Sequence, residues 1–200
     1  TGNCYYSKKG YYDGSGTKAQ FDKPFDAIVD QVKKNTLIVT DYNNNALRTV
    51  DTTTRQVSTL IKLDRFVKPQ RLTQDIVTGN LFITALNKIW HFIYADQTLS
   101  VLAGSDGAGF RNGPFSAALF NEPRGLLKLA DDKLLLGDAE NDRIRILNLN
   151  TSAVSSICTG DENHRDGNYN ICQTYYPQSM VVIDDALFIG TYGRIRKLRG

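Results

Sequence analysis

A proline-led unit of short apolar segments recurs along this chain and constrains its fold more than any other feature. Each unit opens with a proline and an apolar segment, and two further apolar segments follow after short polar turns. A period of this length, repeated in one chain, is the signature of a repeat architecture. The opening prolines, spaced 45, 54 and 54 residues apart, are Pro24, Pro69, Pro123 and Pro177. The best-preserved unit predicts strands from Pro123 to about Leu129, from Lys133 to Gly137 and from Arg143 to Asn148.

A fourth apolar segment follows in three of the units, at residues 56–61, 98–103 and 153–158. Each second segment is continuously apolar, which indicates a strand that is covered on both faces. Four strands per unit, without helical stretches between them, are typical of the stacked blades of a β-propeller. A β-sandwich is the alternative, but a sandwich does not explain self-similarity at a fixed period. The sequence therefore predicts an all-β propeller of four blades, each with four antiparallel strands.

Two parts of the chain resemble the NHL repeat family, in which Asp-Gly-x-Gly, Ala-x-Phe and proline follow one another between blades. Residues 12–24 are similar to this pattern, and residues 106–123 repeat it with an insertion. The next part of the NHL motif is similar to residues 39–48 and 137–145. The likeness is weak in the second unit, which lacks the aspartate at Thr84-Ala85-Leu86-Asn87, and in the fourth unit, which has Thr191-Tyr192-Gly193 there.

The resemblance implies a single propeller domain over residues 1–200. Its ring is closed within this chain, or is part of a larger ring, or is an open array that a partner chain completes. Residues 1–9 form a candidate closing strand for the last blade. The expected blades cover about residues 10–61, 62–103, 104–158 and 159–200.

The polar residues that recur in these units have structural explanations. Asp41 and Asp138 stand at strand ends, where a carboxylate can accept backbone N–H bonds and hold a turn. Arg48, Arg145 and Arg196 recur at one place on the third segment. Because these arginines recur at equivalent positions, we expect them to form ion pairs with the motif aspartates or to lie on a solvated face. A basic stripe with a binding function is the less favoured interpretation.

Two of the three cysteines flank a long polar segment. Cys158 ends the fourth segment of unit three and Cys172 precedes the last proline, so a disulfide between them is sterically reasonable. Closing a loop of about 15 residues would contribute on the order of 3 kcal/mol in the chain-entropy model. The alternative is that the cysteines are free or buried thiols in a reducing compartment. If Cys158 and Cys172 form a disulfide, Cys4 has no assigned partner. Together with the glycosylation sequon at Asn150, the cysteines favour a secreted or extracellular protein.

The chain contains few residues that could serve in catalysis or metal binding. The chain has two histidines, His91 and His164, which are too few for the zinc site of the lyases that some NHL-like propellers form. Residues 161–168 fail the EF-hand spacing because Arg165 occupies a ligand position. Neither a nucleophile signature of the G-x-S-x-G type nor a phosphate-binding lysine after residues 104–113 is present. We therefore expect no catalytic residue, no metal and no cofactor, and hence no enzyme.

The sequence thus predicts a non-catalytic extracellular module that binds protein, or glycan, or assembles with itself through propeller loops and edges. An RNA-binding propeller and a fragment of a propeller enzyme are the alternatives. A net charge of +3, from 24 basic and 21 acidic residues, argues against nucleic acid. No segment approaches the roughly 18–20 apolar residues of a membrane helix. The candidate partner-binding residues are Phe110, Arg111, Phe115, His164, Arg165, Arg71 and Arg124.

Overall fold

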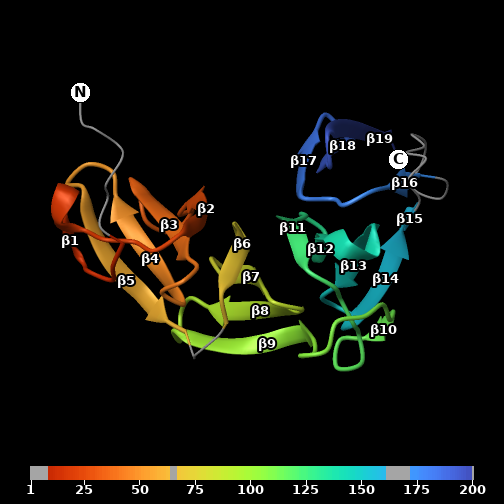
Figure 1. Cartoon of the computed structure of the whole chain (residues 1–200), viewed down its shortest axis with the longest axis horizontal. Coiled ribbons are helices and arrows are strands. Elements are labelled where there is room, and N and C mark those ends of the chain that lie inside the picture. The colour runs from red at the N-terminus through yellow and green to blue at the C-terminus, as the bar shows by residue number, and fades with distance from the viewer. Residues whose placement is uncertain (1–8, 64–66, 161–171, 200) are drawn as a thin grey trace.

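The computed structural model describes residues 9–63, 67–160 and 172–199, which form a nearly all-β structure. Its main strands form four antiparallel sheets, arranged as a four-blade β-propeller (Figure 1). The fold class predicted from the sequence is therefore confirmed. The helices of the described residues are two short 3₁₀ turns, Gly16–Lys18 and Ala139–Asn141, and neither is long and apolar enough to cross a membrane.

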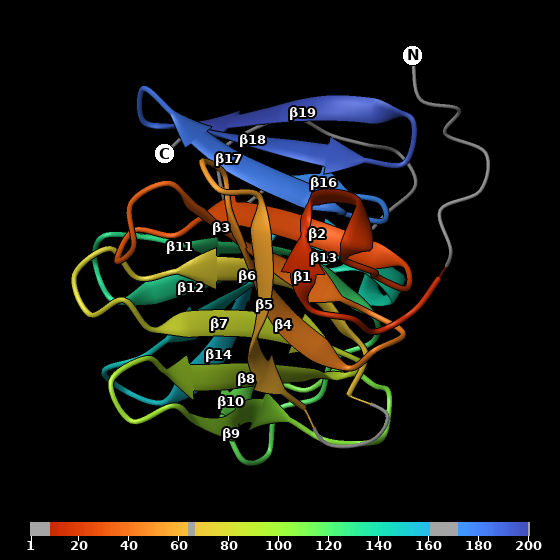
Figure 2. The ribbon, with the colours of Figure 1, turned by 90° about the vertical axis from the view of Figure 1, so that its left-hand side faces the viewer.

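The first two blades follow the predicted order of four antiparallel strands. Blade 1 contains β2 (Pro24–Val29), β3 (Thr36–Asp41), β4 (Ala46–Asp51) and β5 (Gln56–Lys62), with the short β1 (Gly14–Ser15) added at its outer edge. Figure 2 looks onto this edge, where β1 pairs with β5. Blade 2 contains β6 (Pro69–Gln74), β7 (Leu81–Ala85), β8 (Lys88–Ile93) and β9 (Thr98–Gly104).

The last two blades differ in their number of strands. Blade 3 contains β11 (Pro123–Lys128), β12 (Lys133–Asp138), β13 (Arg143–Asn148) and β14 (Ala153–Ile157), with β10 (Gly113–Pro114) at its outer edge. Blade 4 contains three strands in the described residues, β17 (Ser179–Ile183), β18 (Ala186–Thr191) and β19 (Arg194–Arg199). A two-residue parallel pair precedes them, formed by β15 (Thr159–Gly160) and β16 (Gln173–Thr174).

Proline opens the innermost strand of the first three blades, at Pro24, Pro69 and Pro123, while Pro177 lies two residues before β17. A proline has no N–H to give to a sheet, so the first residue of a strand is a position that tolerates it. A register shift follows each of the three strand-opening prolines. The repeated proline therefore marks where each blade begins.

The core lies between successive blades because the second strands alternate their side chains between two neighbours. In blade 2, Leu81 and Ile83 pack toward blade 1, whereas Phe82 packs toward blade 3. In blade 3, Leu134 faces blade 2 and Leu135 faces blade 4. This alternation explains why these segments are continuously apolar, as expected for strands covered on both faces.

The blades form an open arc in the described part of the chain. Inner strands contact one another in the order β2, β6, β11 and β17, and β17 makes no comparable contact with β2 (Figure 1). Residues 1–8 of the candidate closing strand lie outside the described residues, as does Cys4. One face of blade 4 and one face of blade 1 therefore have no neighbouring blade in the described structure.

Candidate binding surface

A buried ion pair joins the segment before blade 1 to the blade itself. Arg48 in β4 and Asp41 at the end of β3 are fully buried, and Arg48 Nη1 lies 2.8 Å from Asp41 Oδ2. Arg48 also donates to the carbonyl oxygens of Gln20 and Tyr12, at 3.1 and 3.0 Å. Asp41 in turn accepts the backbone N–H of Asp22 at 2.9 Å. Arg48 also pairs with Asp13 at 2.6 Å, so this arginine and two carboxylates fix the segment that passes from the outer edge to the inner strand.

Blade 3 repeats this arrangement bond for bond. Arg145 pairs with Asp138 and donates to the carbonyl oxygens of Leu119 and Arg111, at 3.1 and 2.8 Å. Asp138 accepts the N–H of Asn121 at 2.8 Å. The expectation that the recurring arginines pair with the motif aspartates is therefore confirmed in blades 1 and 3.

Burial dominates the electrostatics of the pair in blade 3. Loss of water raises the pKa of Asp138 even though backbone and side-chain hydrogen bonds and Arg145 act in the opposite direction. The same loss of water lowers the pKa of Arg145 against the attraction of Asp138. A buried pair of this kind fixes positions more than it adds net stability, so these residues belong to the scaffold.

The predicted residues near the enlarged loop of residues 104–113 occupy different environments. Phe110 lies under the guanidinium groups of Arg143 and Arg145, at 4.5 and 4.7 Å, and remains 46% exposed. Arg111 has an exposed side chain, although its backbone serves the ion-pair arrangement. Phe115 is only 8% exposed and belongs to the core between blades 2 and 3. Phe115 was predicted to bind a partner, but its burial removes it from the accessible surface.

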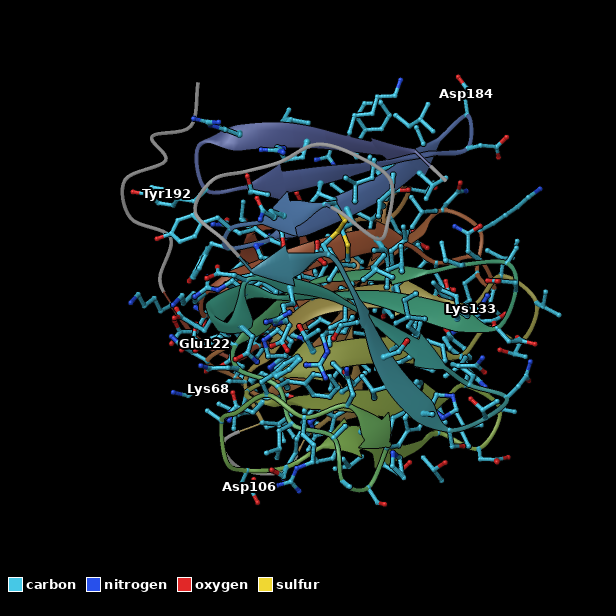
Figure 3. All side chains as sticks on the ribbon, turned by 90° about the vertical axis from the view of Figure 1, so that its right-hand side faces the viewer. Lys68, Asp106, Glu122, Lys133, Asp184 and Tyr192 are labelled. Atoms are coloured by element: carbon cyan, nitrogen blue, oxygen red, sulfur yellow. A yellow bond between two sulfur atoms is a disulfide. The ribbon has the colours of Figure 1, made fainter. Side chains whose placement is uncertain are left out.

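The two ends of the propeller carry different residues. We use the name proline end for the end at which the innermost strands begin. Lys68, Glu122 and Tyr192 lie at this end, and Lys133 and Asp184 lie at the opposite end (Figure 3).

Cations lie over aromatic rings at the proline end of blades 1 and 2. The ring of Tyr42 lies 4.6 Å from the ammonium of Lys23 and 5.7 Å from that of Lys68. The guanidinium of Arg71 lies 5.2 Å from the ring of Phe25, which stacks on Tyr42 at 6.0 Å between centroids. The aromatic rings of this region are therefore partly covered by positive charge.

The same arrangement appears at the junction of blades 3 and 4. Arg124 lies 5.3 Å from the ring of Tyr176 and pairs with Glu122 at 2.7 Å. The side chains of Arg71 and Arg124 are 31% and 28% exposed. Both arginines lie near the start of an innermost strand, so the structure brings these two predicted residues to the same end of the molecule.

A side-chain hydrogen bond at the proline end also joins each pair of neighbouring blades. The residues directly before Pro69, Pro123 and Pro177 have a positive φ of 47° to 49°, and the N–H of each is accepted by an Asn or Asp of the preceding blade. Sequence reasoning missed these bonds, although Asn or Asp directly before the third strand in three units was a usable signal. Gly193 takes that place in the fourth unit. The bonds run from Lys68 to Asn45 at 2.9 Å, from Glu122 to Asn87 at 3.1 Å and from Tyr176 to Asp142 at 2.7 Å.

The predicted disulfide is present between Cys158 and Cys172, whose Cα atoms are 4.6 Å apart. His164 and Arg165, predicted to bind a partner, lie outside the described residues. Asn150 is exposed in the turn between β13 and β14. Within the described ranges, no group of three or more His, Cys, Asp or Glu side chains is placed to hold a metal ion.

No protein-family model matches this chain. The curated protein SUPPRESSOR OF QUENCHING 1, chloroplastic, from Arabidopsis thaliana is 25% identical over 173 residues, which cover 77% of this chain and 16% of that protein. The chain thus spans only a small part of this relative.

Solved structures that resemble this chain are β-propellers. A Bacteroides thetaiotaomicron protein of unknown function has a TM-score of 0.71 at 19% identity, covering 86% of this chain and 46% of its own. An auxiliary nutrient binding protein from Bacteroides ovatus has a TM-score of 0.69 at 16% identity, covering 90% and 48%. Streptogramin B lyase has a TM-score of 0.62 at 13% identity, covering 94% and 58%. At these identities the likeness concerns the fold, and the chain spans about half the length of these structures.

Proposed function

We propose that this chain is an NHL-like, non-catalytic binding module that takes a protein partner at its proline end. The observation that carries this proposal is the series of aromatic rings at that end with a cation over each. The pairs are Tyr42 with Lys23 and Lys68, Phe25 with Arg71, Tyr176 with Arg124, and Phe110 with Arg143. Arg143 belongs to this end because β13 starts there, next to the turn that holds Asp142.

Arginine and aromatic side chains are enriched in protein interfaces and supply much of their binding energy. At the proline end these side chains are preordered by contact with one another, which lowers the entropy cost of binding. Arg71 pairs with Asp26, and Arg124 pairs with Glu122 and also feels the charge of Glu140. Among the described residues, no ion pair joins Lys23 or Lys68 to an acid, and both ammonium groups lie over Tyr42. An acidic segment of a partner protein has the complementary charge.

Two other function classes receive less support from the same residues. RNA-binding surfaces offer open aromatic faces on which bases stack, whereas cations already cover these rings. An enzyme would need a nucleophile with an adjacent base or a bound metal. At the proline end Arg71 and Arg124 are instead held in ion pairs with Asp26 and Glu122. The likeness to streptogramin B lyase is a likeness of fold, and fold does not imply function.

The disulfide supports an extracellular location, because such bonds persist in oxidising compartments and are rare in reducing ones. The exposed sequon at Asn150 agrees with it. A glycan is the second candidate ligand class, and a protein of similar fold is described as nutrient binding.

Selections with three kinds of ligand test the proposal. The chain is offered to a displayed library of random peptides, to a glycan array and to single-stranded RNA oligonucleotides. We expect acidic peptides with aromatic residues to be enriched, and their affinity to fall at least tenfold in the double variant Arg71→Glu, Arg124→Glu. The matched control is Lys133→Glu, a charge reversal at the opposite end of the propeller, which should leave the affinity unchanged. Enrichment of RNA or glycan alone, or equal binding by both variants, would contradict the proposal.

A further inference from the structure

The face of blade 4 that points away from blade 3 has the residue pattern of a face that another blade covers. Register places Val181, Phe188 and Ile195 at the positions through which each of the first three blades contacts the blade after it. We call these three residues the trailing face of blade 4. Ile195 is 80% exposed, whereas its equivalents in the first three blades are 0% exposed. The equivalent sets are Ile28, Ile38 and Leu47 in blade 1, Thr73, Phe82 and Ile89 in blade 2, and Leu127, Leu135 and Ile144 in blade 3.

A hollow of about 220 Å³ opens on the trailing face beside Gly190. Two other blades show what lies at this place when the next blade is present. The hydroxyl group of Thr40, the equivalent of Gly190 in blade 1, donates to the carbonyl oxygen of Gln70 at 2.8 Å. A Cβ atom added to Gly137, the equivalent in blade 3, would lie 2.7 Å from the carbonyl oxygen of Pro177. The hollow therefore lies where the start of a following innermost strand would pack.

Blade 1 has an apolar face on the side away from blade 2, where the described structure places no blade. Its residues Ala27, Leu37 and Val50 form what we call the leading face of blade 1. Ala27 is exposed and the other two are half-buried, whereas the equivalent residues of blades 2 and 3 are all buried against the preceding blade. These equivalents are Leu72, Leu81 and Phe92 in blade 2 and Leu126, Leu134 and Leu147 in blade 3.

The backbone that enters blade 1 also has the conformation that joins blades elsewhere in the chain. Lys23, directly before Pro24, has a φ of 56°. Lys68 and Glu122 have the same left-handed conformation, and each donates its N–H to an asparagine of the preceding blade. Blade 1 is thus shaped to follow another blade.

We propose that two copies of this chain form a head-to-tail dimer, in which the trailing face of blade 4 packs against the leading face of blade 1 of the other copy. The start of β2, at Pro24, fills the hollow beside Gly190. A two-fold rotation joins both pairs of faces at once, so two copies close on each other without leaving a free face. Figure 1 shows the opening of the arc between blades 1 and 4, which the second copy closes.

The chain itself indicates a second copy as the occupant. A trailing face is covered by a leading face at each internal junction, and the leading faces of blades 2, 3 and 4 are already covered within the chain. Blade 1 carries the leading face that is left. Three of the solved propellers that resemble this chain are about twice as long as the part it covers, at 46%, 45% and 48% of their lengths. Two copies therefore supply about as many residues as one of those propellers.

Two differences from the internal junctions make this contact weaker. Gly193 has no side chain to accept the N–H of Lys23 of the second copy. Lys197 adds a charge to the face, with its ammonium 5.3 Å from the ring of Phe188, and taking an unpaired charge out of water costs free energy. We therefore expect a dimer that dissociates on dilution. The first three blades carry Asn45, Asn87 and Asp142 at the place of Gly193, and Thr49, His91 and Ile146 at the place of Lys197.

Sedimentation velocity over a series of protein concentrations tests the proposal. We expect the unaltered chain to pass from monomer to dimer as its concentration rises, without larger species. Ile195→Asp should weaken dimerisation at least tenfold, because it places a carboxylate in the apolar contact. The matched control, Ile76→Asp, changes an isoleucine that is 78% exposed in the turn between β6 and β7 and should leave dimerisation unchanged.

A second variant should strengthen the dimer, which keeps the test independent of damage to the fold. Gly193 has a φ of 76°, and Asn45 at the equivalent place has a φ of 50°, so asparagine suits this backbone. Gly193→Asn should tighten dimerisation at least threefold, because it supplies the missing acceptor. Gly193→Ala adds a Cβ atom without an acceptor and should not tighten it.

Three results would overturn the proposal. The first is a monomer at every concentration, which would assign the open faces to residues 1–8 or to a different polypeptide. The second is a dimer that Ile195→Asp leaves intact, and the third is equal dimerisation of the two Gly193 variants. The contact uses the faces of blades 1 and 4 and not the cation-covered rings of the proline end, so failure of one proposal does not decide the other.

Discussion

Arg48 lies 2.8 Å from Asp41 with both side chains fully buried, and this pair holds the chain segment that enters blade 1. The pair of Arg145 and Asp138 does the same for blade 3. Removing one partner of such a pair leaves a buried charge without compensation, whereas removing both does not. Each pair therefore fixes the conformation of the segment that leads into its blade.

Breaking one pair should destabilise the propeller strongly. For Arg145→Met we expect the free energy of unfolding to fall by about 3–5 kcal/mol, because Asp138 stays buried without its counter-charge. Urea unfolding followed by circular dichroism measures this change. The double variant Arg145→Met, Asp138→Leu should recover most of the loss. The control Arg71→Met removes a partly exposed pair at 3.8 Å and should cost less than about 1 kcal/mol. A double variant no more stable than the single one would refute the argument.

The disulfide should contribute to stability on its own. It closes a segment with a sequence separation of 14 between Cys158 and Cys172. The double variant Cys158→Ser, Cys172→Ser should lose about 2–4 kcal/mol of unfolding free energy, and a reducing agent should lower the Tm of the unaltered chain but not that of the variant. Mass measurement after alkylation under denaturing conditions without reduction should find no more than one alkylated thiol in the unaltered chain. Three alkylated thiols would exclude the disulfide and weaken the case for an extracellular location.

The inter-blade hydrogen bonds at the proline end lead to a local prediction. Asn87 accepts the N–H of Glu122, which has a φ of 47°. Asn87→Ala should cost about 1 kcal/mol of unfolding free energy and should speed amide exchange at Glu122. Asn43→Ala, which removes an exposed side-chain contact to Asp22, is the matched control. Unchanged exchange at Glu122 would show that the bond does not join blades 2 and 3.

The local pattern of apolar and turn residues was enough to predict the positions of most strands. The third strand of blade 3 runs from Arg143 to Asn148, as predicted, because polar turns bound it on both sides and its apolar residues alternate. The ion pairs were also predictable, since a carboxylate and a guanidinium recur at fixed places in two units. Each of these features depends on residues that are close in sequence or repeated at the blade period.

Features that depend on contacts between distant segments were not predictable. The sequence left Phe115 as either a contact residue of the enlarged loop or a residue packed over the blade edge, and the structure places it in the core between blades 2 and 3. The short outer strands β1 and β10 have no apolar pattern, because they pair through backbone alone over two residues. The exposure of Ile195 appears only once its register is compared with that of Ile144. Periodicity tells which face a side chain occupies but not whether another segment covers that face.

His91 should make stability depend on pH near neutrality. Its ring stacks on Phe82 at 4.8 Å between centroids, and its Nε2 atom is buried without a hydrogen-bond partner in the described residues. Burial lowers the pKa of His91 below its ordinary value, and the attraction of Asp75 opposes this only in part.

A lowered pKa means that the unfolded chain binds the proton more readily than the folded chain. The contribution of neutral His91 to the free energy of unfolding should therefore be complete above about pH 6.5, which is the ordinary pKa of histidine. The free energy of unfolding should decrease as the pH falls below this value. Urea unfolding between pH 8 and 5.5, above the range where exposed carboxylates titrate, measures this slope. His91→Gln should flatten the slope. A slope that survives His91→Gln would assign the pH dependence to another group.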